Sequence, residues 1–201
     1  MREGPPGEAD VLVEAGLRVI QRDGIAGATV AAVLAEAGLG TRAFYRHFAS
    51  KNDLLLAVYA TESDAAATRL AARVKDAGDP RAALEAWITE TLSLAFSSRR
   101  AGRTRTLLAE GRRLEASHPG ETARIVRAQL APLEALLADG REQGVFPGAQ
   151  PTDDARSIYA ITMALVAERL TAGARTGGAA ASATAARDHV LRLCLPALEQ
   201  R

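Results

Sequence analysis

Hydrophobic residues recur along the chain with the spacing of amphipathic helices. Within residues 9–23 the apolar and small positions fall at i, i+4, i+7 and i+8, which lie on one face of an α-helix. These positions are Leu12, Gly16, Val19 and Ile20. Gly24 follows, and a glycine just beyond the last periodic residue is typical of a helix end. Almost no segment alternates β-branched and polar residues as strands do, so the pattern predicts an all-α fold.

Two short helices are predicted next. Thr29 provides a hydroxyl for the N-cap of the first of them, and Gly38 ends it. Its hydrophobic positions repeat at i, i+3, i+4 and i+7, namely Val30, Val33, Leu34 and Ala37. The other short helix spans residues 41–47, and we expect Phe44 and Phe48 to face the core because they lie four residues apart.

Longer helices are predicted in the rest of the chain. Residues 50–53, Ser-Lys-Asn-Asp, favour the start of a fourth helix, and Asp79 followed by Pro80 favours the start of a fifth. Further helices are expected over residues 101–116, 119–143, 152–173 and 183–199. Proline- and glycine-containing stretches separate them at 118–120, 147–151 and 177–180.

Composition narrows the classes of protein that this helical chain can belong to. With 201 residues it can bury a core without covalent staples, and its single cysteine, Cys194, cannot form an internal disulfide. The three histidines are scattered, so no metal site is expected. The first residues have no apolar leader, and no stretch approaches the ~20 apolar residues that cross a bilayer. We therefore expect a cytoplasmic protein that does not contact the membrane.

Charge is informative in its distribution and not in its total. The net charge is only +1, which excludes a protein that binds nucleic acid through its whole surface. Between residues 37 and 52, however, every charged side chain is basic. Any contact with nucleic acid is therefore expected from this local patch.

The patch coincides with the pattern of a helix-turn-helix over residues 25–48. Residues 37–40, Ala-Gly-Leu-Gly, join the two short helices, because glycine permits a positive-φ turn and Leu39 can anchor it in the core. In such a motif the second helix enters the major groove of DNA. With Phe44 facing inward, Arg42 and Arg46 lie on or beside the opposite face, where they can bond to guanine or to phosphate.

These residues resemble a known family, the TetR-type transcriptional regulators. The resemblance covers about 50 residues and is carried by residues 44–55, Phe-Tyr-Arg-His-Phe-Ala-Ser-Lys-Asn-Asp-Leu-Leu. The family's pattern of Tyr-x-His-Phe before Ser-Lys is present. Two positions depart from it, since Gly40 stands where many members have a capping serine and Ala31 stands where a polar or basic residue is common.

The resemblance implies particular DNA contacts. Phosphate-contacting positions are expected at Thr29, Tyr45, His47 and Lys51. Base-facing positions are expected at Thr41, Arg42, Ala43 and Arg46. It also implies an N-terminal three-helix bundle with the helix-turn-helix, followed by a larger helical domain for ligand binding and dimerisation. We divide the chain into a disordered tail (1–8), a DNA-binding domain (9–52) and an effector-binding and dimerisation domain (53–201).

The family plan predicts a homodimer formed by the last two helices. The predicted faces are Ala155, Ile158, Tyr159, Thr162, Leu165, Val166 and Arg169 in one helix, and Ala186, Val190, Leu193 and Ala197 in the other. Two recognition helices related by symmetry would require a palindromic operator in double-stranded DNA. A repressor released by a small-molecule effector is the expected function, with no cofactor, and the aliphatic domain favours an apolar or amphipathic effector. Candidate effector contacts are Trp87, Thr91 and Met163.

Alternatives remain for three features. Residues 38–43 match the dinucleotide fingerprint G-x-G-x-x-A, but no strand precedes them, so an enzyme is not expected. A helical small-molecule-binding or protein-interaction module that does not bind DNA is the alternative function. The arginine-rich segment 99–113 could be a solvated helix face, a salt-bridge seam or a cationic wall for an anionic effector.

Overall fold

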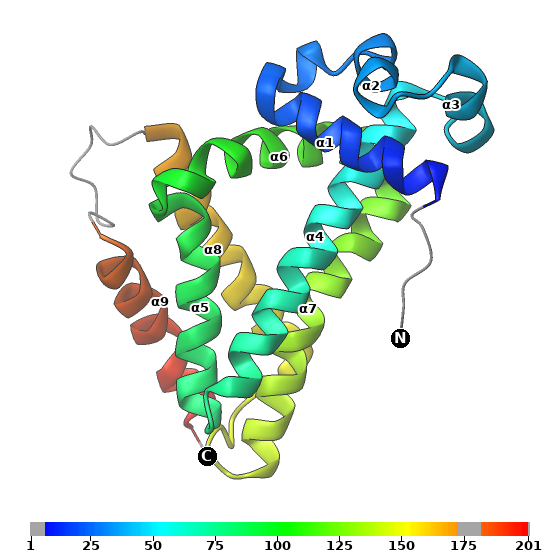
Figure 1. Ribbon diagram of the computed structural model, residues 1–201. Coiled ribbons are helices and arrows are strands. Elements are labelled where there is room, and N and C mark those ends of the chain that lie inside the picture. Colours follow the sequence, from blue (N-terminus) through cyan, green and yellow to red (C-terminus); the bar gives the residue numbers. More distant parts are fainter. Residues whose placement is uncertain (1–6, 173–181, 201) are drawn as a thin grey trace.

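A computed structural model describes residues 7–172 and 182–200, without the side chains of residues 98, 99, 103, 107 and 172. Within these ranges every regular element is an α-helix, as the hydrophobic spacing predicts (Figure 1). The helices are α1 Glu8–Gly27, α2 Val30–Ala37, α3 Thr41–His47, α4 Lys51–Asp76, α5 Pro80–Phe96, α6 Ser98–Ser117, α7 Pro119–Glu142, α8 Pro151–Ala172 and α9 Ala183–Leu198. The predicted separator at 177–180 and most of the predicted tail lie outside the described residues. No helix in the described ranges is long and apolar enough to cross a membrane.

Local capping chemistry fixes where the N-terminal helices begin and end. The Thr29 hydroxyl accepts a hydrogen bond from the backbone N–H of Ala32 at 3.1 Å, and so caps α2 as predicted. Gly38 ends α2 in the left-handed conformation, with φ of 66°. Gly24 also has a positive φ, 73°, and its non-helical conformation interrupts α1 at the predicted stop, although α1 resumes beyond this kink and extends to Gly27.

Further along the chain, the predicted caps of α4 and α5 are confirmed. The Ser50 hydroxyl accepts from the backbone N–H of Asp53, and the Asp79 carboxylate accepts from two N–H groups in the first turn of α5. Pro80 occupies the first turn of α5, where a missing N–H costs nothing. Helix starts were therefore predictable from single residues.

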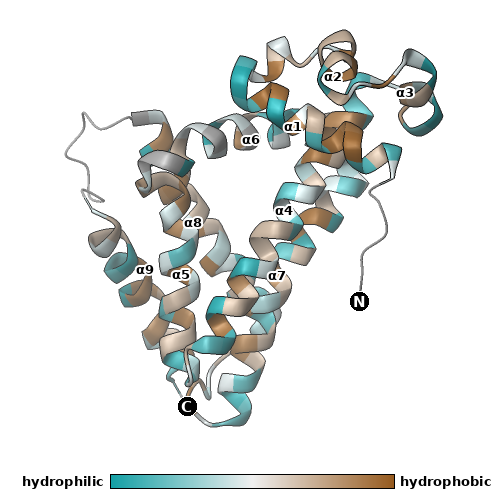
Figure 2. Cartoon of the chain, in the orientation of Figure 1, coloured by the Kyte–Doolittle hydropathy of each residue, from teal (hydrophilic) through white to brown (hydrophobic). Residues whose placement is uncertain are grey.

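The first hydrophobic cluster joins α1, α2 and α3 to the start of α4. Phe44 is fully buried at its centre and Phe48 is 9% exposed, as predicted. The other fully or almost fully buried members include Leu12, Ala15, Val19, Val33, Leu54, Leu55 and Val58. In Figure 2 hydrophobic positions gather where these helices meet. The helix-turn-helix is thus held on α4 by apolar packing.

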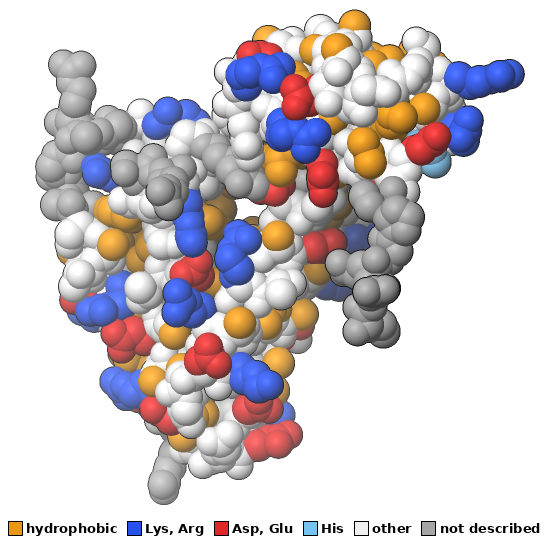
Figure 3. All heavy atoms as spheres, viewed as in Figure 1, with side chains coloured by type: hydrophobic (Ala, Val, Ile, Leu, Met, Phe, Trp, Pro, Cys, Tyr) orange, Lys and Arg blue, Asp and Glu red, His pale blue; other side chains and the backbone are white. Residues whose placement is uncertain are grey.

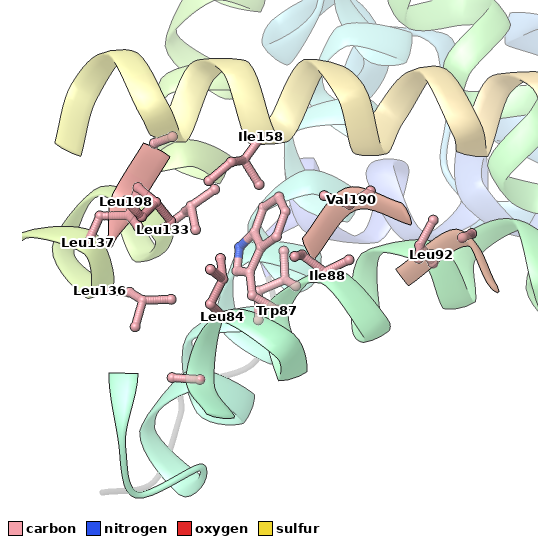
Figure 4. Packing of buried hydrophobic residues seen from close by; sticks show 14 of the residues in the cluster. Leu84, Trp87, Ile88, Leu92, Leu133, Leu136, Leu137, Ile158, Val190 and Leu198 are labelled. Atoms are coloured by element: carbon pink, nitrogen blue, oxygen red, sulfur yellow. The ribbon is translucent and has the colours of Figure 1, made fainter. Parts of the chain in front are cut away.

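The second, larger cluster is built around α5, which packs against α4, α6, α7, α8 and α9. Trp87 of α5 is completely buried, and its indole lies among Leu84, Ile88, Leu133 and Ile158 (Figure 4). Its N–H has no hydrogen-bond partner among the described residues. Trp87 is therefore a core residue whose contribution is the large apolar area that it buries.

One helix, α4, contributes to both clusters. Leu54, Leu55 and Val58 near its start belong to the first cluster, and Leu70 belongs to the second. Gly16 of α1 lies close to this helix, since a Cβ built on it would be 3.3 Å from a methyl group of Val58. The two clusters are thus connected through one continuous helix, and the predicted boundary between residues 52 and 53 stays a prediction.

The predicted dimer faces of α8 and α9 are corrected by the packing within the chain. In α8 the residues Ala155, Ile158, Thr162 and Val166 are buried in the chain's own core, and Leu165 is half-buried. In α9 the predicted face is divided, because Ala186 and Val190 are fully buried whereas Leu193 is 51% exposed and Ala197 is exposed. A 3.6-residue period identifies an apolar face but not the surface that covers it. Of the predicted faces, Leu193 and Ala197 are therefore the exposed residues that remain available to a partner.

Candidate nucleic-acid interface and internal cavities

The short helix α3 has one buried face and one exposed face. Phe44 has no exposed surface, and its ring contacts that of Tyr45 edge-on with 5.3 Å between the centroids. Tyr45 itself is 61% exposed. Thr41, Arg42 and Arg46 are exposed as well, and they precede or follow the buried pair of residues 43 and 44. The outer face of α3 therefore presents hydroxyl and guanidinium donors, which suit base edges and phosphates.

The prediction for Ala43 requires correction. Its side chain is only 8% exposed, because it lies next to Phe44 on the inner side of α3. A buried methyl group cannot make the apolar contact with a thymine methyl that an exposed alanine could make. The base-facing set is therefore reduced to Thr41, Arg42 and Arg46.

Two of the predicted phosphate-contacting residues also have structural roles. Thr29 is exposed at the N-terminus of α2, where its hydroxyl already caps the helix. The Lys51 ammonium donates to the carbonyl oxygen of Ile25 at 3.0 Å and so ties the start of α4 to the last turn of α1. An ammonium has three donors, so Lys51 keeps two for another acceptor.

A carboxylate that the sequence analysis missed lies against the exposed face of α3. Glu8, in the first turn of α1, accepts from Arg46 Nη1 at 2.9 Å and lies 3.2 Å from His47 Nε2. Figure 3 shows acidic, basic and histidine side chains together at this end of the molecule. The two partners are 38 and 39 residues away in sequence, so no local spacing indicates the contact. Glu8 thus contacts the side chains of Arg46 and His47, which the recognition helix would use to bind DNA.

Charged side chains also fix α2 on α1. Glu36 accepts from Arg18 Nε at 2.9 Å and from Arg22 Nη1 at 2.8 Å. The hydrogen bond from Arg22, followed by that from Arg18, lowers the pKa of the Glu36 carboxyl. The helix preceding the turn is thus positioned by these contacts in addition to the apolar cluster.

A cavity of about 280 Å³ lies between α4, α5, α6, α7 and α8. It brings together Thr91 and Met163, two of the three predicted effector contacts. Trp87 does not line it, and this prediction is corrected, because the indole is packed in the core with its ring centroid 6.4 Å from that of Tyr159. Leu70, Leu94, Leu108 and Ala66 give the cavity an apolar part.

Polar side chains line the rest of this first cavity. The Tyr159 hydroxyl donates to Gln129 Oε1 at 2.7 Å, and burial raises the pKa of Tyr159 to about 12. Burial likewise raises the pKa of Tyr59, while a hydrogen bond with Ser63 lowers it. Both phenols are therefore uncharged hydrogen-bonding groups near neutral pH.

A second cavity of about 620 Å³ adjoins the first and lies between α4, α6, α7 and α8. Tyr59 and Leu108 line both cavities. The second is rich in charge, and its charged lining residues are Arg112, Arg127, Arg156, Glu115 and Glu134.

The arginine-rich segment does not have a single role. Arg100 lines the first cavity and pairs with Glu90 at 2.7 Å, and Arg105 Nε donates to the carbonyl oxygen of Leu170 at 2.9 Å. Arg112 and Arg113 are both exposed, and of the two Arg112 lines the second cavity. Among the described residues no group of three or more His, Cys, Asp or Glu side chains is arranged to hold a metal ion.

Comparison with known proteins supports this description of the N-terminal domain. Residues 12–58 match the sequence model of the family described as bacterial regulatory proteins, tetR family. The match lies on α1, α2, α3 and the start of α4, and so identifies a tetR-family domain in this part of the chain. No curated protein sequence is significantly similar to this chain.

Solved structures show that the whole chain shares the fold of transcriptional regulators. The fatty acid degradation regulator FadR from Bacillus halodurans is similar with a TM-score of 0.70, 21% identity and complete coverage of both chains. FadR from Bacillus subtilis, solved in complex with stearoyl-CoA, has a TM-score of 0.68 and 19% identity over 95% of this chain and 98% of its own. A putative transcriptional regulator from Pseudomonas aeruginosa PAO1 has a TM-score of 0.71 and 20% identity over 98% of this chain and 93% of its own.

Proposed function

We propose that this chain is a dimeric repressor of the tetR type that binds a palindromic operator and is released from it by a small-molecule effector. The observation that carries the proposal is the division of α3 into a buried aromatic face and an exposed face with donors. Thr41, Arg42 and Arg46 are assigned to base edges. Thr29, Tyr45, His47 and Lys51 are assigned to phosphates, which fix the register of the protein on the duplex.

Dimerisation is proposed through the C-terminal helices. Leu193 of α9 is one of two large hydrophobic residues that are exposed in the described part of the chain, the other being Tyr45. Ala197, one turn further along α9, is exposed too. A twofold interface on this surface would hide Leu193 and would present two recognition helices to symmetric half-sites.

The effector is proposed to occupy the first cavity. Six lining residues come from one face of α4 (Tyr59, Glu62, Ser63, Ala66, Arg69 and Leu70). Tyr59 directly follows Val58, which is buried in the N-terminal cluster and approaches Gly16 of α1. A molecule that repositions α4 in the cavity therefore also repositions the helix-turn-helix, and it weakens DNA binding if it prefers the state that fits the operator less well.

An apolar or amphipathic effector fits the mixture of side chains in the cavity. Leu70, Leu94, Leu108 and Met163 offer apolar contacts beside the tyrosine and glutamine donors and acceptors. The similar FadR from Bacillus subtilis was solved with stearoyl-CoA, a long-chain amphiphile. Long-chain amphiphiles are therefore the first class of compound to test as effectors.

Selection from a random library of double-stranded DNA by the purified protein tests the proposed function. We expect enrichment of a sequence with twofold symmetry, and its affinity should fall steeply as the salt concentration rises because phosphate contacts release counterions. Arg42→Ala combined with Arg46→Ala should abolish the enrichment, whereas Arg124→Ala, an exposed change in α7, should leave it intact. Failure to enrich any sequence would favour a helical interaction module that does not bind DNA.

A further inference from the structure

Three arginines that are exposed to solvent line the second cavity. They are Arg112 of α6, Arg127 of α7 and Arg156 of α8. Within the described ranges none of the three has a carboxylate within 4.0 Å. Glu115 and Glu134 line the same cavity, so the arginines exceed the carboxylates by one charge. Three unpaired guanidinium groups from three helices are suited to an anion, because each can donate two parallel hydrogen bonds to a carboxylate or phosphate.

The first cavity provides the complementary apolar surface. Alone, its volume of about 280 Å³ falls just below the ~300–1,000 Å³ that is usual for small-molecule sites. Together with the second cavity, of about 620 Å³, it comes well within that range. A ligand that extends through both would be larger than either cavity alone can hold.

The two cavities meet at residues that occur in both linings. Tyr59 and Leu108 line both cavities. The Tyr59 ring lies directly on the backbone of Gly111, where an added Cβ would approach its Cζ and Oη atoms to 3.0 Å. Burial raises the pKa of the Tyr59 hydroxyl, and an interaction with Ser63, which lines the first cavity, lowers it. Rotation of one phenol ring and one leucine could therefore connect the cavities without a change in the helices.

We propose that the two cavities are two compartments of one effector site, and that the effector is an anionic amphiphile. Its aliphatic chain occupies the first cavity, and its carboxylate or phosphate group is bound by Arg112, Arg127 and Arg156 in the second. Tyr59 lies beside the chain where it passes between the compartments. This assignment rests on the proposed function, since it specifies the chemical class of the effector.

Three probes of equal chain length separate the contribution of the head group from that of the chain. Laurate, dodecyl phosphate and 1-dodecanol, each below its aggregation concentration, are titrated against the full-length protein. Trp87 is the only tryptophan, and its ring centroid lies 6.4 Å from that of Tyr159, which lines the first cavity, so its fluorescence reports binding. We expect both anions to bind at least ~10-fold more tightly than the alcohol, because charged hydrogen bonds are stronger than neutral ones.

Variants assign each end of the probe to its compartment. Arg127→Gln combined with Arg156→Gln should weaken binding of both anions about tenfold and leave dodecanol unchanged. Arg124→Gln is the matched control, because Arg124 is exposed, like Arg127 on the same helix, but lines neither cavity. Ala66→Leu, which fills the first cavity, should weaken all three probes. A preference for phosphate over laurate would identify a phosphorylated head group, and the reverse would identify a free carboxylate.

Two results would overturn the assignment: equal affinities for the three probes, or anion binding that survives the double glutamine change. Operator binding is measured separately in the presence of each probe. If the anions bind as expected but the operator is not released, the two-compartment site stands and the proposed effector-controlled repression fails. If an unrelated compound releases the operator while no anion binds, the repression stands and the assignment of an anionic amphiphile fails.

Discussion

The carboxylate of Glu8 lies 2.9 Å from the guanidinium of Arg46, so the first turn of α1 is joined to the recognition helix by an ion pair. His47 lies 3.2 Å from the same carboxylate oxygen. The Glu8 and Arg46 side chains are 40% and 59% exposed, so the pair is accessible to a competing anion. DNA would therefore compete with Glu8 for these two side chains.

Removal of this carboxylate should therefore strengthen DNA binding. We expect Glu8→Gln to raise operator affinity by about 1.4- to 5-fold at low salt, which corresponds to the ~0.2–1 kcal/mol of an exposed ion pair. Titration of labelled operator at several salt concentrations measures the gain, which should shrink as salt rises. Glu14→Gln removes the same charge from an exposed position in α1 and controls for the change in net charge. Equal gains for the two variants would show that Glu8 does not compete locally.

The exposed arginines of α3 should determine sequence preference. Replacement of Arg42 or Arg46 by alanine should cost about 1–3 kcal/mol on the selected operator and much less on a sequence changed at the contacted base pair. Binding constants on matched and mismatched operators measure the difference. If each variant loses the same affinity on every sequence, these arginines only contact phosphate, and sequence preference must come from Thr41 or from DNA shape.

Lys51 should behave differently, because it contacts the protein as well. Lys51→Ala should weaken binding to all DNA sequences alike and reduce the salt slope by about one unit. It should also lower the thermal stability, since the Ile25 carbonyl oxygen loses one of its two donors at the junction of α1 and α4 and keeps only the Ala28 N–H. Thermal unfolding and salt-dependent titration of one preparation measure both effects. If the stability falls but the salt slope does not change, Lys51 does not contact DNA phosphate and has only a structural role.

Much of the local structure could be predicted because its causes are local. Thr29, Ser50 and Asp79 each cap a helix through a hydrogen bond to a residue two or three positions away. Phe44 was predicted to be buried from its spacing to Phe48, and the structure confirms it. These features depend on side-chain chemistry within one helical turn, which the sequence displays directly.

Contacts between distant segments could not be predicted in the same way. The position of Trp87 in its helix predicts an effector contact. Its side chain instead points into the core, among side chains of α7 and α8. Glu8 reaches α3 only because α1 packs across the bundle, and the burial of Ala43 depends on the same packing. The number of residues between two helices does not fix their relative orientation, so the partners of such side chains require the tertiary structure.

The exposed hydrophobic residue of α9 offers a direct test of dimerisation. Leu193→Glu should convert a dimer to a monomer at micromolar concentrations, because a carboxylate buried in the interface would have no partner. Sedimentation velocity measures the oligomeric state. Thr184→Glu places the same charge at another exposed position of α9 and should leave the dimer intact. A dimer that tolerates Leu193→Glu would place the interface elsewhere.

The single cysteine provides a test that depends on pH. Burial raises the pKa of the Cys194 thiol from 9.0 to about 11. The folded protein should therefore contain about 100-fold less thiolate at pH 8 than an unfolded chain, and iodoacetamide should react correspondingly slowly. The contribution of this group to stability is complete below pH 9 and is lost as the pH rises toward 11, because the folded state favours the protonated thiol. Rapid alkylation of the native protein at pH 8 would contradict this environment.

Because α4 is one continuous helix, a movement at the cavities is transmitted along it to the DNA-binding helices. The 26 residues of α4 span about 39 Å at 1.5 Å per residue, so a tilt of about 5° around Asp76 moves Lys51 by about 3 Å. In a twofold dimer the displacement occurs in both subunits, and the distance between the recognition helices can change by about 6 Å. Half-sites one turn apart are separated by ~34–36 Å, so such a change is large enough to put one helix out of register when the other is bound. A small ligand could thus control a large complex through the length of one helix.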